Sequence, residues 1–234
     1  MAGQQIKVIL FDLGNVLVDF DHKRAAERIS VFCKKSPLEI YNLFFDSQVT
    51  VAFEEGKLSP EKFYQQVKEM LDLKLSYDSF VPIWNDIFFL SAKNRSVYRL
   101  VNILHAGYKT AMLSNINLLH YEYLKKGFPV FGVFDKIFLS FKLGLVKPDK
   151  KIYENVIAAM RVSPQEIFYT DDRQELVQSA NSLGIKGHCF SGFQQLIRDM
   201  RDSGIAASPA APRNDKENKF SSNLAKMLDN ANIL

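Results

Sequence analysis

The stretch that most constrains this chain is Ile6–Leu17, in which an apolar run ends abruptly at a carboxylate. The consecutive apolar residues Val8–Phe11 fit a strand buried on both faces, which is typical of a parallel sheet. Such sheets bind ligands in the crevice outside the carboxyl ends of their strands, and Asp12 would lie there. Gly14 would permit a tight turn and a close approach of the backbone to a ligand. Taken alone, the stretch is better explained as a strand and an ordinary turn, so its function depends on the rest of the chain.

The composition is that of a globular protein with enough apolar residues for a sizeable core. Hydrophobic residues make up 47% of the 234 residues, and the formal net charge of +4 is spread along the chain. Because no basic stripe is present, we expect no nucleic-acid partner. Neither a membrane-spanning run nor a signal-peptide pattern is found, so we expect no membrane partner and a cytoplasmic location. Cys33 and Cys189 lack a metal-ligand spacing and do not predict a disulfide framework.

The sequence changes to a helical periodicity after Leu17. Helix starts are indicated by the capping-box pattern of Ser36–Glu39 and by Ser59-Pro60, where proline would take the first helical position. A further helix is predicted over Ser79–Phe89. Since this block lacks the alternation of strands and helices on either side of it, we interpret residues 18–93 as a helical insert. Additional helices packed on the sheet are the alternative.

Strand and helix patterns alternate from residue 94 to residue 204. Short apolar runs predict strands at 109–113, 137–140, 167–169 and 185–190. Helices are predicted over 97–104, from Pro148 through Met160, and from Asp172 to Leu183. Strands separated by helices indicate an α/β fold with a parallel, doubly wound sheet, formed here by residues 1–17 and 94–204. Residues 205–234 are rich in alanine, proline and charged side chains, and are predicted to be a flexible C-terminal tail.

Polar or charged residues stand at the ends of four separate segments: Asp12, Ser114-Asn115, Lys147 and Asp171-Asp172. If these segments meet at one edge of the sheet, they place an aspartate, a hydroxyl, an ammonium group and an acidic pair around one crevice. These groups are suited to phosphoryl transfer. An anionic nucleophile can attack a phosphate dianion only where its charge is neutralised, as by a metal ion, a lysine and hydrogen-bond donors. Mg²⁺ prefers one or two carboxylates, and a carboxylate nucleophile can form an aspartyl-phosphate that water then cleaves.

These four segments resemble the four motifs of the haloacid dehalogenase-like (HAD) hydrolase superfamily. The matching residues are Phe11–Leu17, Leu113–Asn115, Lys147–Asp149 and Tyr169–Asp172. The resemblance implies a Rossmann-like HAD core with an inserted α-helical C1 cap, in the position of the helical insert. Through Phe53–Ser59 and Leu113–Asn115 the chain is most similar to one branch. That branch contains bacterial α-glucose-1-phosphate phosphatase and the N-terminal phosphatase domain of soluble epoxide hydrolase.

The resemblance also implies a Mg²⁺ site around the nucleophile. Asp12 would be both the nucleophile and a metal ligand. The backbone carbonyl of Gly14 and the carboxylate of Asp172 would be further ligands, and Asp171 would act directly or through water.

The remaining motif residues would bind the phosphoryl group. Ser114 and the backbone amide of Asn115 would hold its oxygens, and Lys147 would neutralise charge on the nucleophile and the phosphate. Glu54 aligns with a cap position of the family and could face a substrate hydroxyl. An exposed carboxylate at a helix end is an equally good explanation of Glu54.

One position departs from the family pattern. Most phosphatases of the superfamily carry a second aspartate two positions after the nucleophile, as general acid and base, and Gly14 stands there. General acid–base catalysis contributes roughly 10²–10⁴-fold, so poor leaving groups would react slowly. Asp19 and Asp21 could substitute, but solvated turn carboxylates are the better interpretation.

The expected function is Mg²⁺-dependent hydrolysis of a phosphomonoester through an aspartyl-phosphate, on a small sugar phosphate or related metabolite. The second hypothesis is a catalytically weak binding or regulatory protein, which Gly14 motivates. A 2-haloacid dehalogenase would also lack the second aspartate, but it uses no metal and would leave Asp171-Asp172 unexplained. A phosphomutase is disfavoured because the reverse proton transfer needs the missing acid. The sequence gives no indication of the oligomeric state.

Several residues that often serve in catalysis are interpreted here as structural. The histidines have no pairing spacing and are expected in structural or surface roles: His22, His105, His120 and His188. Trp84 and the Phe44-Phe45 pair are expected in the core of the insert.

Overall fold

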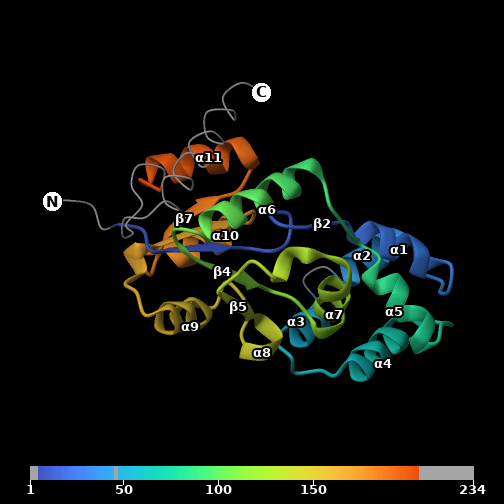
Figure 1. Cartoon of the computed structure of the whole chain (residues 1–234). Helices are drawn as coiled ribbons and strands as arrows, with labels where there is room; N and C mark the ends of the chain where they lie inside the picture. Colours follow the sequence, from blue (N-terminus) through green and yellow to red (C-terminus); the bar gives the residue numbers. More distant parts are fainter. Residues whose placement is uncertain (1–4, 45–46, 206–234) are drawn as a thin grey trace.

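A five-stranded parallel sheet in the order β5-β4-β1-β6-β7 lies at the centre of the computed structural model (Figure 1). The structure describes residues 5–44 and 47–205. The strands are β1 (Val8–Phe11), β4 (Lys109–Ser114), β5 (Lys136–Leu139), β6 (Ile167–Asp171) and β7 (Lys186–Cys189). All neighbouring pairs in the sheet run parallel. The predicted α/β class with a doubly wound parallel sheet is therefore confirmed.

Strand β1 occupies the middle of the sheet because all four of its residues are apolar. Successive side chains of a strand point to opposite faces, so Ile9 and Phe11 join one hydrophobic cluster while Val8 and Leu10 join another. Helices α6 (Ala92–Leu104) and α11 (Phe193–Asp202) cover the first face. Helices α9 (Lys150–Met160) and α10 (Gln174–Asn181) cover the second. Two short helices, α7 (Leu118–Gly127) and α8 (Ser140–Leu143), flank β5 in the sequence, and 3₁₀ turns lie at Pro129–Phe131 and Pro164–Glu166.

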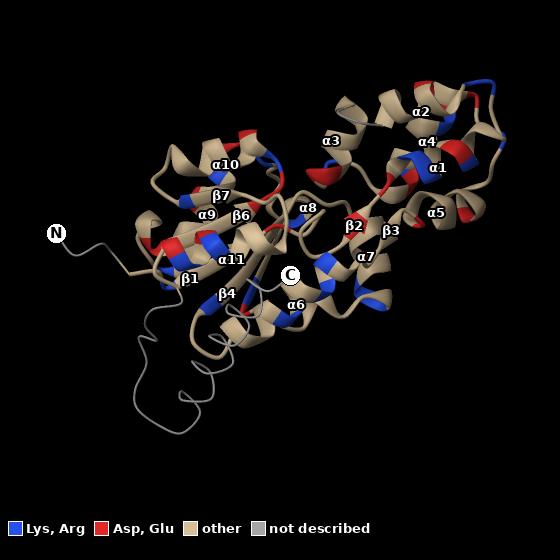
Figure 2. Ribbon diagram, turned by 90° about the horizontal axis from the view of Figure 1, so that it is seen from above, with Lys and Arg blue, Asp and Glu red and all other residues tan. Residues whose placement is uncertain are grey.

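Five helices between β1 and α6 gather at one side of the molecule, away from α9, α10 and α11 (Figures 1 and 2). They are α1 (His22–Ser30), α2 (Pro37–Phe44), α3 (Gln48–Glu54), α4 (Pro60–Leu71) and α5 (Tyr77–Asn85). These helices share a hydrophobic cluster of their own, separate from the two that cover the sheet. Trp84 lies at its centre, with its ring 5.1 Å from Phe44 and 4.9 Å from Phe63. Phe45 lies outside the described residues.

A short antiparallel ribbon links this helical group to the sheet. Strand β2 (Asp19–Phe20) pairs with β3 (Phe88–Phe89). The predicted helix over Ser79–Phe89 is wrong at its end, because α5 stops at Asn85 and Phe89 belongs to the ribbon. A two-residue strand is too short to produce a periodic pattern, and its pairing across the insert is a tertiary effect.

Capping hydrogen bonds confirm the helix starts predicted at Ser36 and Ser59. The backbone amide of Ser36 donates to Glu39 at 2.8 Å, and the hydroxyl of Ser59 accepts from the amide of Lys62. These bonds satisfy donors that a helix N-terminus leaves unpaired. Ile205 is buried, and its carbonyl accepts a bond from the Tyr108 hydroxyl at 2.6 Å. The rest of the predicted tail, 206–234, lies outside the described residues.

Charged side chains are distributed over both parts of the molecule, with basic and acidic segments interspersed (Figure 2). Among residues 5–44 and 47–205, no helix has the length and apolar character needed to cross a bilayer. Cys33 and Cys189 are both free thiols.

Candidate active site

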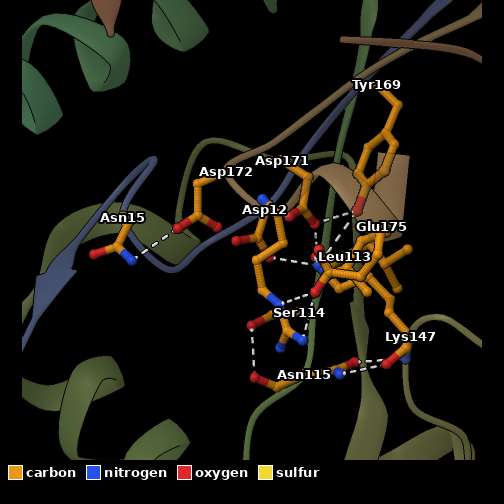
Figure 3. Close-up of polar contacts among 12 residues, drawn as sticks. Asp12, Asn15, Leu113, Ser114, Asn115, Lys147, Tyr169, Asp171, Asp172 and Glu175 are labelled. Carbon is orange, nitrogen blue, oxygen red and sulfur yellow. Dashed lines mark hydrogen bonds and ion pairs between the residues drawn. The ribbon is translucent and has the colours of Figure 1, made fainter. Parts of the chain in front are cut away.

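The carboxyl ends of three adjacent strands bring the motif residues together (Figure 3). Asp12 follows β1 directly, while Ser114 and Asp171 are the last residues of β4 and β6. Because β4, β1 and β6 are neighbours and parallel, their ends share one edge of the sheet. All three side chains are buried. The pairing of β1 with β6 thus brings Asp12 and Asp171 together, although more than 150 residues separate them in the sequence.

Lys147 lies between two of these carboxylates. Its Nζ donates to Asp12 Oδ1 at 2.7 Å and to Asp171 Oδ2 at 2.6 Å, and the residue is 4% exposed. Burial alone would lower the pKa of Lys147, but the two carboxylates outweigh it and hold the pKa above its ordinary value. The lysine is therefore fully charged at neutral pH.

The pKa of Asp12 is raised to about 7, chiefly by burial, while Lys147 opposes the shift and Asp171 adds to it. Asp171 is completely buried, accepts from the backbone amide of Arg173 at 2.9 Å and also accepts from the hydroxyl of Tyr169. Both oxygens of Asp171 are thus engaged by the protein. An excess of negative charge in this group makes a further cation favourable.

Asp172 lies beside Asp12 and Asp171, and a residue of the loop after β1 holds its side chain by a hydrogen bond. The side-chain amide of Asn15 donates to Asp172 Oδ2 at 2.8 Å. Oxygens of Asp12, Asp171 and Asp172 lie within 4.8 Å of one another. The left-handed residue of this loop is Asn15, at φ 55°, whereas Gly14 has no positive φ. Asn15 therefore takes the left-handed conformation of this turn, and the close approach of the Gly14 backbone to a ligand stays a prediction.

Asn115 positions the backbone of Lys147. Its side-chain amide donates to the Lys147 carbonyl at 2.9 Å and its oxygen accepts from the Lys147 amide at 2.8 Å. The next residue, Ile116, is anchored in the same way by Ser140, whose hydroxyl bonds both its amide and its carbonyl. The sequence did not predict this role of the Asn115 side chain, because the partners lie 32 residues apart. The loop after β4 and the Lys147 segment are consequently fixed to each other.

A cavity of about 620 Å³ opens in front of these residues and is lined from both parts of the molecule. The sheet edge contributes Asp12, Gly14, Ser114, Asn115, Lys147, Asp171 and Asp172. The ribbon and the helical group contribute Phe20, His22, Tyr41, Phe44, Thr50, Glu54 and Phe88. The structure thus brings all eight predicted site residues, Glu54 included, to one cavity.

Two histidines that were expected to be structural or surface residues also line the cavity. The rings of His22 and His120 lie 6.4 Å apart, and His120 stacks on Trp84 at 5.1 Å. His120 comes from α7, a helix that the sequence patterns did not predict. The Nε2 of His120 donates to the backbone carbonyl of Trp84, and its Nδ1 accepts from the side-chain amide of Asn117. Because one ring nitrogen donates and the other accepts, the imidazole of His120 is in its neutral form. Burial lowers its pKa to about 3, and burial lowers that of His22 to about 4.

The other two histidines do not line this cavity. His105 lies 3.4 Å from Asp135, and His188 lies 3.5 Å from Asp199. Both pairs join elements that support the sheet, in agreement with a structural role.

The two aspartates considered as substitutes for a second catalytic aspartate have other partners. Asp19 is 9% exposed and accepts from Lys93 at 2.8 Å and Asn94 at 3.0 Å. Burial would raise the pKa of Asp19, but these bonds lower it below its ordinary value. Asp21 caps α1 by accepting from the amide of Lys23. The interpretation of Asp19 as a solvated turn carboxylate is wrong, since it is an internal anchor of the loop.

Fold and site together define an α/β enzyme whose reacting groups lie at the carboxyl edge of a parallel sheet, facing a separate helical layer. The chain belongs to the haloacid dehalogenase-like hydrolase family, whose sequence profile matches residues 6–184. It is therefore a hydrolase.

Two curated relatives are phosphatases. A D-ribitol-5-phosphate phosphatase from Bacteroides thetaiotaomicron is 27% identical over 190 residues, which cover 77% of this chain and 90% of that protein. A sesquiterpene phosphatase from Aspergillus oryzae is 25% identical over 181 residues, covering 77% and 88%.

Solved structures have the same fold. An enzyme of the family from Bacteroides thetaiotaomicron, in complex with magnesium and inorganic phosphate, is 27% identical with a TM-score of 0.69. The match covers 79% of this chain and 93% of that chain. A dehalogenase that is 17% identical, with a TM-score of 0.58, covers 80% and 85% and shares the fold alone.

Proposed function

We propose that this chain is a Mg²⁺-dependent phosphomonoester hydrolase that works through an aspartyl-phosphate on Asp12. The observation that carries the proposal is the position of Lys147, whose Nζ contacts both Asp12 and Asp171 at the floor of the cavity. A lysine in this place neutralises a nucleophilic carboxylate and an incoming phosphate at once. The phosphatase relatives and the magnesium- and phosphate-bound structure support the same chemistry.

The carboxylate group fits a magnesium ion. Three aspartates share one lysine, so the carboxylates outnumber the cations of this group, and hard oxygen donors are what Mg²⁺ prefers. Asp12, Asp172 and the carbonyl of Gly14 would hold the ion. Both oxygens of Asp171 already accept hydrogen bonds from the protein. Asp171 would therefore hold Lys147 in place, or contact the metal ion through a water molecule. The bound ion would supply charge neutralisation for the nucleophile and the phosphate.

The reaction would proceed in two steps at Asp12. A carboxylate oxygen of Asp12 attacks phosphorus while the bond to the ester oxygen breaks, which leaves an aspartyl-phosphate and an alkoxide that takes a proton from water to become the alcohol. Water then attacks phosphorus, which releases inorganic phosphate and restores the carboxylate. Ser114 and the backbone amide of Asn115 would hold the phosphoryl oxygens, and Lys147 would compensate their charge in both steps.

The helical group would select the substrate. We assign residues 18–93 to a cap and residues 1–17 and 94–204 to the core, since the cavity lies between two separately packed sets of helices. Glu54 would accept a hydrogen bond from a substrate hydroxyl, which favours a small sugar phosphate or related metabolite. The relative that acts on D-ribitol-5-phosphate supports this substrate class.

The test is phosphate release from a panel of sugar phosphates and other phosphomonoesters, with Mg²⁺ and with EDTA. We expect release that requires the metal and is abolished by Asp12→Asn. The matched control is Asp202→Asn, at an exposed aspartate at the end of α11, which should retain full activity. No release from any ester by folded protein saturated with Mg²⁺ would contradict the proposal. A catalytically weak binding protein would then be the better hypothesis.

A further inference from the structure

A buried tyrosine outside the predicted set of site residues lies against Lys147 (Figure 3). Tyr169 comes two positions before Asp171 on β6, so the two side chains point to the same face of the sheet. The hydroxyl of Tyr169 donates to Oδ2 of Asp171, and the Nζ of Lys147 lies 3.3 Å from the hydroxyl oxygen. Tyr169 and Asp171 are both fully buried. The phenol therefore belongs to the interior of the site rather than to the wall of the cavity.

Two donors share one oxygen of Asp171. Its Oδ2 accepts from Lys147 Nζ at 2.6 Å and from the Tyr169 hydroxyl, while its Oδ1 accepts from the backbone amide of Arg173. An ammonium group has three protons to donate, and the short contacts of Lys147 go to Asp171 and to Asp12, the latter at 2.7 Å. The two carboxylates thus compete for one cation. A second donor on Asp171 shifts this competition toward Asp12, because part of the charge of Asp171 is already compensated.

The hydroxyl of Tyr169 has little freedom to choose another acceptor. Its ring packs against Tyr153 with the centroids 5.8 Å apart, inside one of the two hydrophobic clusters that cover the sheet. The hydroxyl of Tyr153 donates to the Leu176 carbonyl at 2.9 Å. Burial, assisted by the charge of Asp171, raises the pKa of Tyr169 well above its ordinary value, so the phenol keeps its proton. A rigid donor that is protonated at neutral pH is thus fixed on Asp171.

We propose that Tyr169 is a positioning residue of the reaction, whose hydroxyl binds Asp171 and thereby keeps the Lys147 ammonium directed at Asp12. The inference rests on the proposed phosphatase function and adds one residue to its machinery. In the transition state, negative charge is spread over the equatorial oxygens of the phosphoryl group next to Asp12, and Lys147 must compensate it there. Without the hydroxyl, Asp171 would hold the ammonium more strongly and draw it away from the reacting atoms.

The direct test is Tyr169→Phe, which removes the hydroxyl and leaves the ring in place. With p-nitrophenyl phosphate and saturating Mg²⁺, we expect kcat and kcat/KM to fall together by at least about tenfold, the lower end of the effect of outer hydrogen-bond partners at metal sites. KM should change by less than about twofold, since an equal fall in kcat and kcat/KM marks an interaction made only in the transition state. An unchanged kcat, or a fall in kcat/KM that comes from KM alone, would overturn the proposal.

The matched control is Tyr64→Phe. Tyr64 is also buried, and its hydroxyl donates to the backbone carbonyl of Leu75 within the helical group. This variant loses a buried tyrosine hydroxyl away from Lys147, so it should keep the kcat and KM of the wild type. An equal fall of kcat in Tyr64→Phe and Tyr169→Phe would show a general effect of losing such a hydroxyl, and would refute the specific role of Tyr169.

Equilibrium binding gives a readout that does not depend on turnover. Vanadate can take a five-coordinate geometry that resembles the transition state, whereas inorganic phosphate is tetrahedral like the ground state. In titration calorimetry with Mg²⁺, Tyr169→Phe should bind vanadate at least about tenfold more weakly than the wild type, and phosphate within about twofold. A purely structural role of Tyr169 would weaken the binding of both ligands alike or of neither, and either result would overturn the proposal.

A measurement on the wild type keeps the proposal falsifiable even if Tyr169→Phe does not fold. The hydroxyl proton of Tyr169, buried and bonded to a carboxylate, should exchange slowly with water and give a proton NMR signal downfield of the backbone amides, with cross-peaks to its own ring. Absence of this signal at neutral pH would overturn the proposal.

Failure of the proposed function gives a different result from failure of this inference. If the chain is not a phosphatase, neither the wild type nor Tyr64→Phe releases phosphate from any ester. If only the inference fails, the wild type and Tyr169→Phe are equally active.

Discussion

Replacing Lys147 by methionine should destabilise the fold as well as stop the reaction. Lys147 is 4% exposed, and its ammonium group is the cationic partner of both Asp12 and Asp171. Methionine fills a similar volume but leaves two buried carboxylates without that compensation. Removing one partner of a buried ion pair costs about 3–5 kcal/mol. Since domains are stable by about 5–15 kcal/mol, the variant should fold with a much reduced free energy of unfolding.

The assay is urea unfolding followed by circular dichroism, in EDTA at pH 8 and at pH 5. Lys150→Met is the matched control, because Lys150 is exposed three residues away, and surface substitutions cost within about 0.5 kcal/mol. At pH 8 we expect Lys147→Met to lose about 3–5 kcal/mol relative to the wild type, and the control to lose almost nothing.

The pH dependence has a definite sign. The folded-state pKa of Asp12 is about 7 against an ordinary value of 3.8, and removal of Lys147 raises it further. A carboxyl group with a raised folded-state pKa destabilises the fold above that pKa, and the penalty is relieved as the pH falls toward the unfolded value. The loss caused by Lys147→Met should therefore be smaller at pH 5 than at pH 8. A loss under about 1 kcal/mol, or an equal loss at both pH values, would refute this account of the site.

Three further substitutions test other contacts. Asn15→Ala removes the 2.8 Å bond to Asp172 and should weaken Mg²⁺ binding about 10–100-fold, measured by titration calorimetry; an unchanged affinity would place the ion elsewhere. Asn94→Ala leaves the buried carbonyl of Val16 without its donor and should cost about 1–3 kcal/mol in urea unfolding, and a neutral effect would show that water replaces the amide. The folded-state pKa of His120 is about 3 against 6.5, so the stability associated with its neutral ring is complete above pH 6.5 and is lost as the pH falls toward 3. His120→Phe should make the unfolding free energy less dependent on pH between 6.5 and 4, and equal slopes in both proteins would exclude this role.

The sequence predicts the sheet and its reactive edge because both depend on local patterns. A buried parallel strand is a short apolar run, and its carboxyl end is where the run stops, as at Asp12 and Asp171. Capping boxes and the proline after Ser59 likewise mark helix starts through neighbouring residues.

The features that the sequence did not predict depend on contacts between distant segments. The ribbon of Phe20 and Phe88 has two residues in each strand and exists only because the strands pair across the whole insert. His120 reaches the cavity on a helix with weak patterning, and its neutral state depends on Trp84, 36 residues away. The pairing of Asn115 with the Lys147 backbone is similar. Side chains that support a site from elsewhere in the chain leave no periodic signal.

The central position of β1 also has a consequence for biosynthesis. Its two partners in the sheet lie about 100 and 160 residues further along the chain, with Val8 opposite Lys109 and Ile167. On the ribosome, this apolar strand must wait unpaired until both partners have been made, whereas the cluster of α1 to α5 joins residues 25–87 and can pack much earlier. Sheets that depend on such distant pairings fold slowly and expose aggregation-prone edges meanwhile. In a growing chain, the helices opposite Asp12 should therefore be in place before the strand that carries Asp12 has found its neighbours.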